Sequence, residues 1–224
     1  MVVGTNAIID ISSFQGNPDF ARVKAAGIIG VIHKATEGLG FHDSAYAVNK
    51  QAAKAEGLLW GAYHFGTGSD PEMQAHEFLQ VAALKDDELI ALDFEDNTHG
   101  TQMTVAGAKL FVNKVFSIAG RRPLIYSGNT IKQALGNTVD PDLGKCFLWV
   151  AQFDTSPNAP QIQKTWSNFT FWQYTDGKSG PLPHTVDGIG PCDRDTFNGD
   201  EATLREFWKN GGIVPAAPAP AATA

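Results

Sequence analysis

Segments typical of β-strands and of α-helices alternate along most of this 224-residue chain. The strand-like segments are residues 7–12, 29–35, 59–65, 89–95 and 123–127, and helix-like segments follow them at 20–26, 44–56, 70–84, 104–119 and 131–135. Repeated strand–helix units predict a parallel sheet with helices outside it. Three more strands are expected at 147–153, 169–175 and 193–197, followed by a helix at 203–209. Eight strands of this kind predict an α/β fold in which the sheet closes into one barrel.

Composition narrows the classes of partner that the chain can have. Its 17 Lys and Arg residues and 24 Asp and Glu residues give a net charge of −7, and no basic patch stands out, so we expect no nucleic-acid or anionic-membrane partner. No apolar run approaches the roughly 18 residues of a membrane span, and residues 1–11 lack the pattern of a signal peptide. We expect one folded domain over residues 1–212 and a disordered Pro/Ala tail or linker over 213–224.

The sequence gives no indication of a metal, a cofactor or a disulfide framework. Its two cysteines, Cys146 and Cys192, precede the sixth and the last predicted strand, and we predict that they stay unpaired at opposite ends of the barrel. The six His residues are scattered and show no spacing typical of metal ligands. We therefore expect no metal and no cofactor, and we expect a monomer.

An apolar run, residues 89–92, leads directly into Asp93 and Glu95. In a strand these two carboxylates share one face, and burying both is costly unless they have a role. Asp10 ends the first predicted strand and Asp193 lies by the last, so four carboxylates would converge at the mouth of the barrel. Such a cluster is typical of an acid/base pair with neighbours that tune it. The alternative is that the strand ends at residue 92 and the acids form a solvated loop or a helix start.

Eight short stretches of the chain occur in the order that is typical of one enzyme family. They are residues 8–16 (IIDISSFQG), 34–38 (KATEG), 57–65 (GLLWGAYHF), 91–95 (ALDFE), 123–127 (PLIYS), 148–153 (LWVAQF), 171–175 (FWQYT) and 192–199 (CDRDTFNG). In these stretches the chain resembles the glycoside hydrolase family 25 lysozymes, also called Chalaropsis-type muramidases. The resemblance implies an irregular TIM-like (β/α)5(β)3 barrel that cleaves the β-1,4 bond between N-acetylmuramic acid and N-acetylglucosamine in peptidoglycan. By motif, it places the family's acidic set on Asp10, Asp93, Glu95 and Asp193.

Two positions depart from the family's usual pattern. The last motif usually carries Asn two residues after its acid, whereas here Asp195 follows Asp193. Strand alternation puts both on one face, and we choose Asp193 as the carboxylate that faces the cleft. Near Phe41 the family often carries Tyr, so a hydroxyl contact is expected to be missing there.

The resemblance and the chemistry of glycoside hydrolysis together suggest a role for each acid. Glu95 is interpreted as the general acid, because its side chain is the longer one and Asp93 beside it would raise its pKa. Asp93 would then stay ionised, and would either attack the anomeric carbon or orient the substrate's 2-acetamido group as the nucleophile. The resemblance favours the acetamido route, with net retention; a purely electrostatic Asp93 is the alternative. Asp10 and Asp193 would position the sugar, unless they are structural caps or ion-pair partners.

Aromatic residues near strand ends are candidates to stack on sugar rings, although core packing is the commoner role of an aromatic residue in a strand. Tyr126 is the best placed of them, and Tyr63 and Trp149 are further candidates for substrate binding. Lys34 and Gln173 are polar residues within apolar strands. Because buried polar groups need partners, we expect both to join the polar network of the cleft.

Two other functions stay open from the sequence. A non-catalytic carbohydrate-binding barrel is one, although the presence of all four carboxylates argues against it. A chitinase-like amino-sugar hydrolase is the other, but that family usually carries a longer acidic run than residues 91–95 provide. The expected partner is the glycan strand of bacterial peptidoglycan. We expect the protein to act on the bacterial cell wall, either outside the cell or after release at host lysis.

Overall fold

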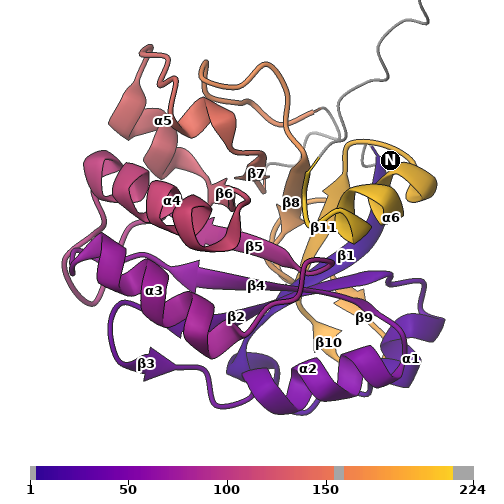
Figure 1. The fold of residues 1–224 in the computed structure, drawn as a ribbon. Helices are drawn as coiled ribbons and strands as arrows, with labels where there is room; N and C mark the ends of the chain where they lie inside the picture. The colour runs from indigo at the N-terminus through magenta and orange to yellow at the C-terminus, as the bar shows by residue number, and fades with distance from the viewer. Residues whose placement is uncertain (1–3, 154–158, 214–224) are drawn as a thin grey trace, which may run out of the picture.

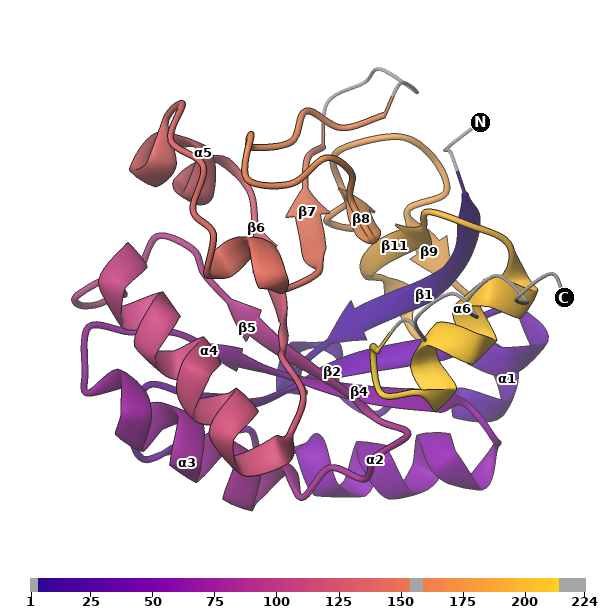
Figure 2. The same ribbon diagram turned by 45° about the horizontal axis from the view of Figure 1, so that its top comes forward.

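The computed structural model describes residues 4–153 and 159–213, and in these ranges eight strands close into a barrel (Figures 1 and 2). The strands in order around the barrel are β1 (Thr5–Ile11), β2 (Gly30–Glu37), β4 (Leu59–Phe65), β5 (Leu89–Asp93), β6 (Leu124–Ser127), β7 (Leu148–Ala151), β8 (Phe171–Thr175) and β11 (Asp193–Phe197). The barrel closes because β1 pairs with both β2 and β11. The predicted α/β barrel is therefore confirmed.

Helices cover the outer side of the first strands, and α2, α3 and α4 lie along β2, β4 and β5 (Figures 1 and 2). The helices are α1 (Phe20–Ala25), α2 (Tyr46–Ala55), α3 (Pro71–Ala82), α4 (Val105–Ala119), α5 (Asn129–Leu135) and α6 (Glu201–Lys209), with short 3-10 helices η1 (Ser13–Gln15) and η2 (Leu143–Lys145). Asp70 caps α3 by accepting hydrogen bonds from two backbone N–H groups, and Pro71 follows at the first helical position. Within the described ranges, every helix is too short or too polar to span a bilayer.

Several details differ from the sequence-based prediction. We expected a parallel sheet, but β11 runs antiparallel to both β1 and β8, because it follows β8 without a crossover helix. Strand β5 ends at Asp93 and not at residue 95, so Glu95 lies on the loop that follows. Three short strands were not predicted: β3 (Phe41–His42), β9 (Thr185–Val186) and β10 (Gly190–Pro191). Of the predicted tail, residues 214–224 lie outside the described residues.

Apolar side chains from the inward faces of the strands fill the lower part of the barrel. They include Ile8, Ile32, Leu89, Leu124 and Phe171, and helix α6 adds Phe207 and Trp208 from below. Strand β2 approaches Trp208 so closely that a Cβ atom on Gly30 would lie 2.6 Å from the indole ring. Glycine at position 30 therefore allows α6 to close the bottom of the barrel. The open space that remains is at the other end.

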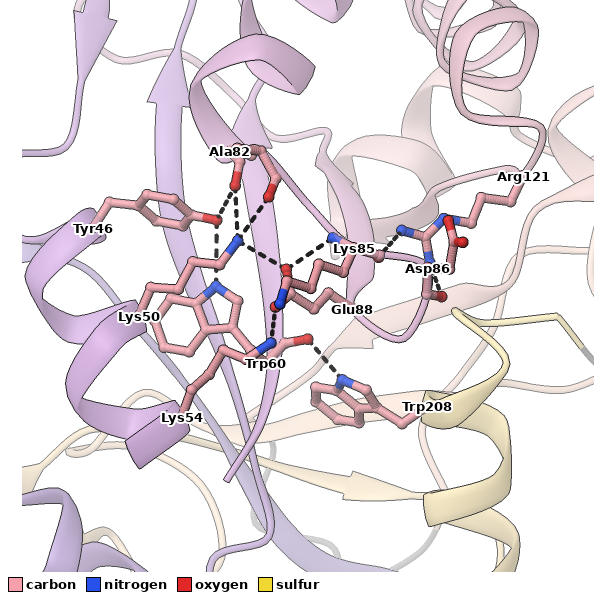
Figure 3. A network of polar contacts seen from close by, with 11 residues as sticks. Tyr46, Lys50, Lys54, Trp60, Ala82, Lys85, Asp86, Glu88, Arg121 and Trp208 are labelled. Atoms are coloured by element: carbon pink, nitrogen blue, oxygen red, sulfur yellow. Dashed lines mark hydrogen bonds and ion pairs between the residues drawn. The ribbon is translucent and has the colours of Figure 1, made fainter. Parts of the chain in front are cut away.

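A buried ion network lies at the closed end of the barrel, where α2 meets the loop between α3 and β5 (Figure 3). The carboxylate of Glu88 is 1% exposed and pairs with Lys54 and, at 2.8 Å, with Lys50. It also accepts a hydrogen bond of 3.0 Å from the backbone N–H of Lys85. Lys50 donates further to the carbonyl oxygens of Ala82 and Ala83, each at 3.0 Å. Glu88 thus ties α2 to the segment that leads into β5.

Both cysteines are unpaired, as predicted, and both are buried. Burial raises the pKa of the Cys146 thiol to about 12, and it raises that of Cys192 to about 12 as well. The reactive thiolate is therefore scarce at neutral pH. We expect a thiol reagent to leave the native protein almost unlabelled and to titrate both thiols after denaturation without reductant. Rapid labelling of the folded protein would contradict this expectation.

Candidate active site

A cavity of about 240 Å³ opens at the mouth of the barrel, above its apolar filling. It is lined by Asp10, Tyr63, Asp93, Glu95, Tyr126, Trp149, Phe153, Gln173, Asp176 and Asp193. These residues come from seven of the barrel strands or the loops that directly follow them. A concave site with converging polar groups on an aromatic wall is the expected form of a small-ligand site.

Strand register brings the four predicted acids to this mouth. Asp10 lies opposite Asp193 in the β1–β11 pair, and Asp93 lies beside Tyr126 in the β5–β6 pair. Asp193 is the first residue of an antiparallel strand, so it reaches the mouth from the amino end of β11 and not from a carboxyl end, as we had expected. Because an antiparallel strand starts where its neighbours end, the acids still lie at one level.

The Asp93 carboxylate is the deeper member of the predicted catalytic pair. It is 7% exposed, and its Oδ1 atom finds no hydrogen-bond donor among the described residues. Burial, followed by repulsion from Glu95, raises the pKa of Asp93 well above its usual range. Burial and then Asp96 raise the pKa of Glu95. We had expected Asp93 to raise the pKa of Glu95 and stay ionised; in the structure the deeper Asp93 also tends to hold a proton.

A chain of hydrogen bonds crosses the floor of the cavity. The Tyr126 hydroxyl donates to Oε1 of Gln173 at 2.7 Å, and Nε2 of Gln173 donates to Oδ2 of Asp10 at 2.7 Å. Asp195 lies beneath this chain, fully buried, and its Oδ1 accepts a hydrogen bond of 2.6 Å from Nε1 of Trp149. Asp195 shares the inward face of β11 with Asp193, but only Asp193 lines the cavity.

The electrostatics of the cavity favour protonated carboxyl groups. Burial, followed by Asp195 and Asp193, raises the pKa of Asp10 well above its usual range. Burial, followed by Asp176 and Glu95, raises the pKa of Asp193 to about 7. No Lys or Arg side chain is among the residues that line the described cavity. Burial and mutual repulsion therefore favour the protonated forms of these carboxyl groups.

The predicted substrate-binding residues divide into two groups. Tyr63, Tyr126, Trp149 and Gln173 line the cavity, and the Tyr126 and Trp149 rings meet edge to face at 4.7 Å. Lys34 is not among the lining residues, although its charge lowers the pKa of Asp93, so its expected place in the cleft network stays a prediction.

The Lys34 ammonium pairs instead with Glu37 and lies 5.4 Å from the Phe41 ring centroid. Directly after Lys34, the register of β2 shifts against β4. The aromatic ring at position 41 thus packs on a cation, and Phe41 as a whole is 47% exposed.

Two lining residues were missed by reasoning from the sequence. Phe153 was included in a predicted strand but was not singled out as a site residue, and it lies two residues beyond the end of β7. Asp176 is the first residue after β8, and its Oδ1 accepts hydrogen bonds from the backbone N–H groups of Lys178 and Ser179. Its position directly after a strand end was the available signal. Within the described ranges, no group of His, Cys, Asp and Glu side chains is arranged to hold a metal ion.

Comparisons with known proteins agree with this geometry. The structure is similar to a bacterial lysozyme from Streptomyces coelicolor, with a TM-score of 0.81 and 28% identity over 95% of this chain and 100% of that one. It is also similar to a muramidase from Acremonium alcalophilum, with a TM-score of 0.78 and 32% identity over 92% of this chain and 99% of that one. In sequence it is 28% identical to Lysozyme M1 of Streptomyces globisporus over 216 residues, which are 90% of this chain and 71% of the relative.

The sequence profile of glycosyl hydrolases family 25 matches residues 9–181, which hold most of the barrel and three of the four predicted acids. The closed barrel, the acidic mouth and this match point to the same family. The chain belongs to family 25 of the glycosyl hydrolases.

Proposed function

We propose that this protein is a muramidase that hydrolyses the β-1,4 bond between N-acetylmuramic acid and N-acetylglucosamine in peptidoglycan. Membership of glycosyl hydrolase family 25 supports the reaction class. Similar proteins described as lysozymes and muramidases support the substrate.

The observation that carries the mechanism is the unpartnered Oδ1 atom of Asp93, which is buried in the cavity wall. A buried carboxylate oxygen without a donor costs free energy, and an N–H group from the substrate would satisfy it. The 2-acetamido group of the sugar carries such an N–H. Bonded to Asp93, the amide would be held with its carbonyl oxygen directed at the anomeric carbon, as substrate-assisted hydrolysis with net retention requires.

Substrate binding would also settle where the proton of the Asp93–Glu95 pair resides. A donated hydrogen bond stabilises the ionised form of Asp93 and so lowers its pKa. Glu95 is less deeply buried and lies on the loop after β5, where its carboxyl can reach the glycosidic oxygen. The proton then stays on Glu95, which donates it to the leaving group. Water finally attacks the anomeric carbon, with Glu95 as the base.

The other lining residues would bind and position the sugar. The Tyr126 ring stands against Trp149, so one aromatic face is braced for contact with the apolar face of a pyranose. Asp10 is fixed by Gln173 and Asp193 stands opposite it, so both can accept hydrogen bonds from sugar hydroxyl groups. The place of action would be the bacterial wall, reached from outside the cell or at host lysis.

Digestion of purified peptidoglycan followed by mass analysis of the muropeptides tests this proposal. We expect new reducing ends at N-acetylmuramic acid. Chitin, which lacks muramic acid, is the control substrate and should not be cleaved. Reducing ends at N-acetylglucosamine would indicate a different glycosidase. Cleavage of chitin would indicate a general amino-sugar hydrolase. Binding to walls without products would indicate a carbohydrate-binding barrel.

A further inference from the structure

Below the floor of the cavity lies one more carboxyl group, which takes no part in the reaction described above. Asp195 is fully buried on the inward face of β11. One of its oxygen atoms, Oδ1, accepts the indole N–H of Trp149 at 2.6 Å. The other, Oδ2, has no N–H or hydroxyl donor among the described residues. A buried carboxylate oxygen without a donor needs an explanation.

Asp10 supplies the missing partner. Asp10 lies opposite Asp193 in the β1–β11 pair and Asp195 lies opposite Ile8, so Asp10 and Asp195 are diagonal neighbours on the inward face of the barrel. Each of the two carboxyl groups affects the pKa of the other, both by charge repulsion on Asp10 and through a side-chain hydrogen bond. Oδ2 of Asp10 already accepts the amide N–H of Gln173 at 2.7 Å. Two carboxyl groups can form a hydrogen bond only when one of them carries a proton, because an ionised carboxylate is an acceptor only.

The surroundings offer no other way to hold two negative charges. Asp193 faces the pair from β11, and Asp93 and Glu95 share the cavity from β5. Trp149 on β7 and Gln173 on β8 contribute only neutral donors. Arg194 lowers the pKa of Asp195, but its guanidinium donates to the Thr185 carbonyl and the Asn6 side chain and not to either carboxyl. Burial raises the pKa of Tyr63 on β4 and of Cys192 beside β11, so both stay neutral and supply no charge.

We propose that Asp195 is a positioning residue that shares one proton with Asp10, and that loss of this proton sets the alkaline limit of the enzyme. The shared proton holds the Asp10 carboxyl against the floor. Through Gln173 the same chain reaches the Tyr126 hydroxyl, which lines the sugar site. When the proton leaves, the two adjacent carboxylates repel each other. Asp10, the end of the hydrogen-bond chain, is then no longer held in place. The inference rests on the proposed function at one point, which is that Asp10 and Tyr126 contact the sugar.

The direction of the titration follows from burial. Burial raises the pKa of Asp195 to about 8, although the hydrogen bonds from Trp149 and Asp10 lower it. Burial, followed by repulsion from Asp195 and Asp193, raises the pKa of Asp10 well above its usual range, and the bond to Asp195 raises it further, so Asp10 is the donor of the shared proton. The folded value thus lies above the unfolded one, so the folded state binds the proton more tightly. The stabilisation is complete at acidic pH and is lost as the pH rises through the folded value.

The variant Asp195→Asn tests the proposal, because its amide can donate permanently to Asp10 while its oxygen still accepts from Trp149. Relative to each enzyme's own maximum, we expect the alkaline limb of wall hydrolysis to move upward by roughly one pH unit or more. Asp195→Ala has no donor and should lose most activity at every pH. Asp87→Asn, on the exposed surface, is the matched charge control and should leave the profile unchanged. An unmoved limb in Asp195→Asn would overturn the proposal.

Infrared spectroscopy provides a readout that does not depend on activity. In mildly acidic buffer, the wild-type protein should show more carbonyl absorption from protonated carboxyl groups than Asp195→Asn does, whereas Asp87→Asn should match the wild type. If Asp195→Asn does not fold, Asp10→Asn should remove the same absorption. Equal absorption in all folded variants would refute the shared proton. If the protein proved not to be a muramidase, this spectrum would still decide the proposal.

Discussion

Glu95→Gln is expected to lower hydrolysis of peptidoglycan by roughly 10²–10⁴-fold, the usual contribution of a general acid. Glutamine keeps the size and the hydrogen-bonding shape of the side chain but cannot protonate the leaving oxygen. Binding of the glycan should persist, because the aromatic wall and Asp10 are untouched. An aryl glycoside of the same sugar, whose leaving group needs little protonation, should be hydrolysed with a much smaller loss.

Asp93→Asn is the matched variant, because it lies two residues away and also exchanges a carboxyl for an amide. Asp93 is proposed to act on the acetamido group, so its loss should slow both substrates to a similar extent. Rates on wall fragments and on the aryl glycoside should therefore be measured for both variants side by side. If Glu95→Gln slows both substrates equally and Asp93→Asn spares the activated one, the two roles are reversed. This comparison is needed because burial raises the pKa of Asp93 as well, so Asp93 could also carry the proton of a general acid.

Glu88→Ala is expected to cause a large loss of stability although the residue lies far from the mouth of the barrel. It leaves the Lys50 and Lys54 ammonium groups and the Lys85 N–H without their buried partner. Breaking a buried ion pair by removing one partner costs about 3–5 kcal/mol. The two ammonium groups are 18% and 32% exposed, so water can take up part of their charge, and we expect the lower end of this range.

Urea unfolding at neutral pH measures this effect. Glu201→Ala, which removes one partner of an exposed ion pair with Arg205, is the control and should cost less than about 1 kcal/mol. Despite its burial, the hydrogen bonds from Lys50 and Lys54 lower the pKa of Glu88 below its ordinary value of 4.5. Its stabilisation is therefore present above that value and is lost as the pH falls through the folded pKa. A difference between wild type and Glu88→Ala that does not shrink in acid would contradict the ion network as its source.

The two ends of the barrel are expected to respond to pH in opposite directions. Glu88 at the closed end has a lowered pKa, so its contribution fades in acid. Asp195 at the open end has a raised pKa, so its contribution fades in alkali. The difference arises because Glu88 pairs with two lysine ammonium groups, whereas Asp195 is buried beside other carboxyl groups and its direct donor, Trp149, is neutral.

The sequence by itself determined the succession of strands and helices, and with it the barrel. Hydrophobic periodicity and helix stop signals are local, so they placed the barrel strands within two residues of their observed ends. Local adjacency also paired Asp93 with Glu95, because residues that end one buried strand and begin its loop must enter the same space. Strand ends predicted the mouth, and Asp10, Tyr63, Tyr126 and Gln173 lie there.

Only the tertiary structure decided how these residues face one another. The antiparallel direction of β11 and its register against β1 brought Asp195 into contact with Asp10, and no local pattern encodes a pairing between the two ends of the chain. Lys34 pairs with Glu37 on its own strand, and loop geometry brought Asp176 into the lining of the cavity. The pKa values likewise depended on burial, which is the largest cause of the raised pKa of Asp93, of Asp10 and of Asp195. Depth and long-range contact arise from the closure of the whole barrel, because each strand is buried by neighbours that are distant in the sequence.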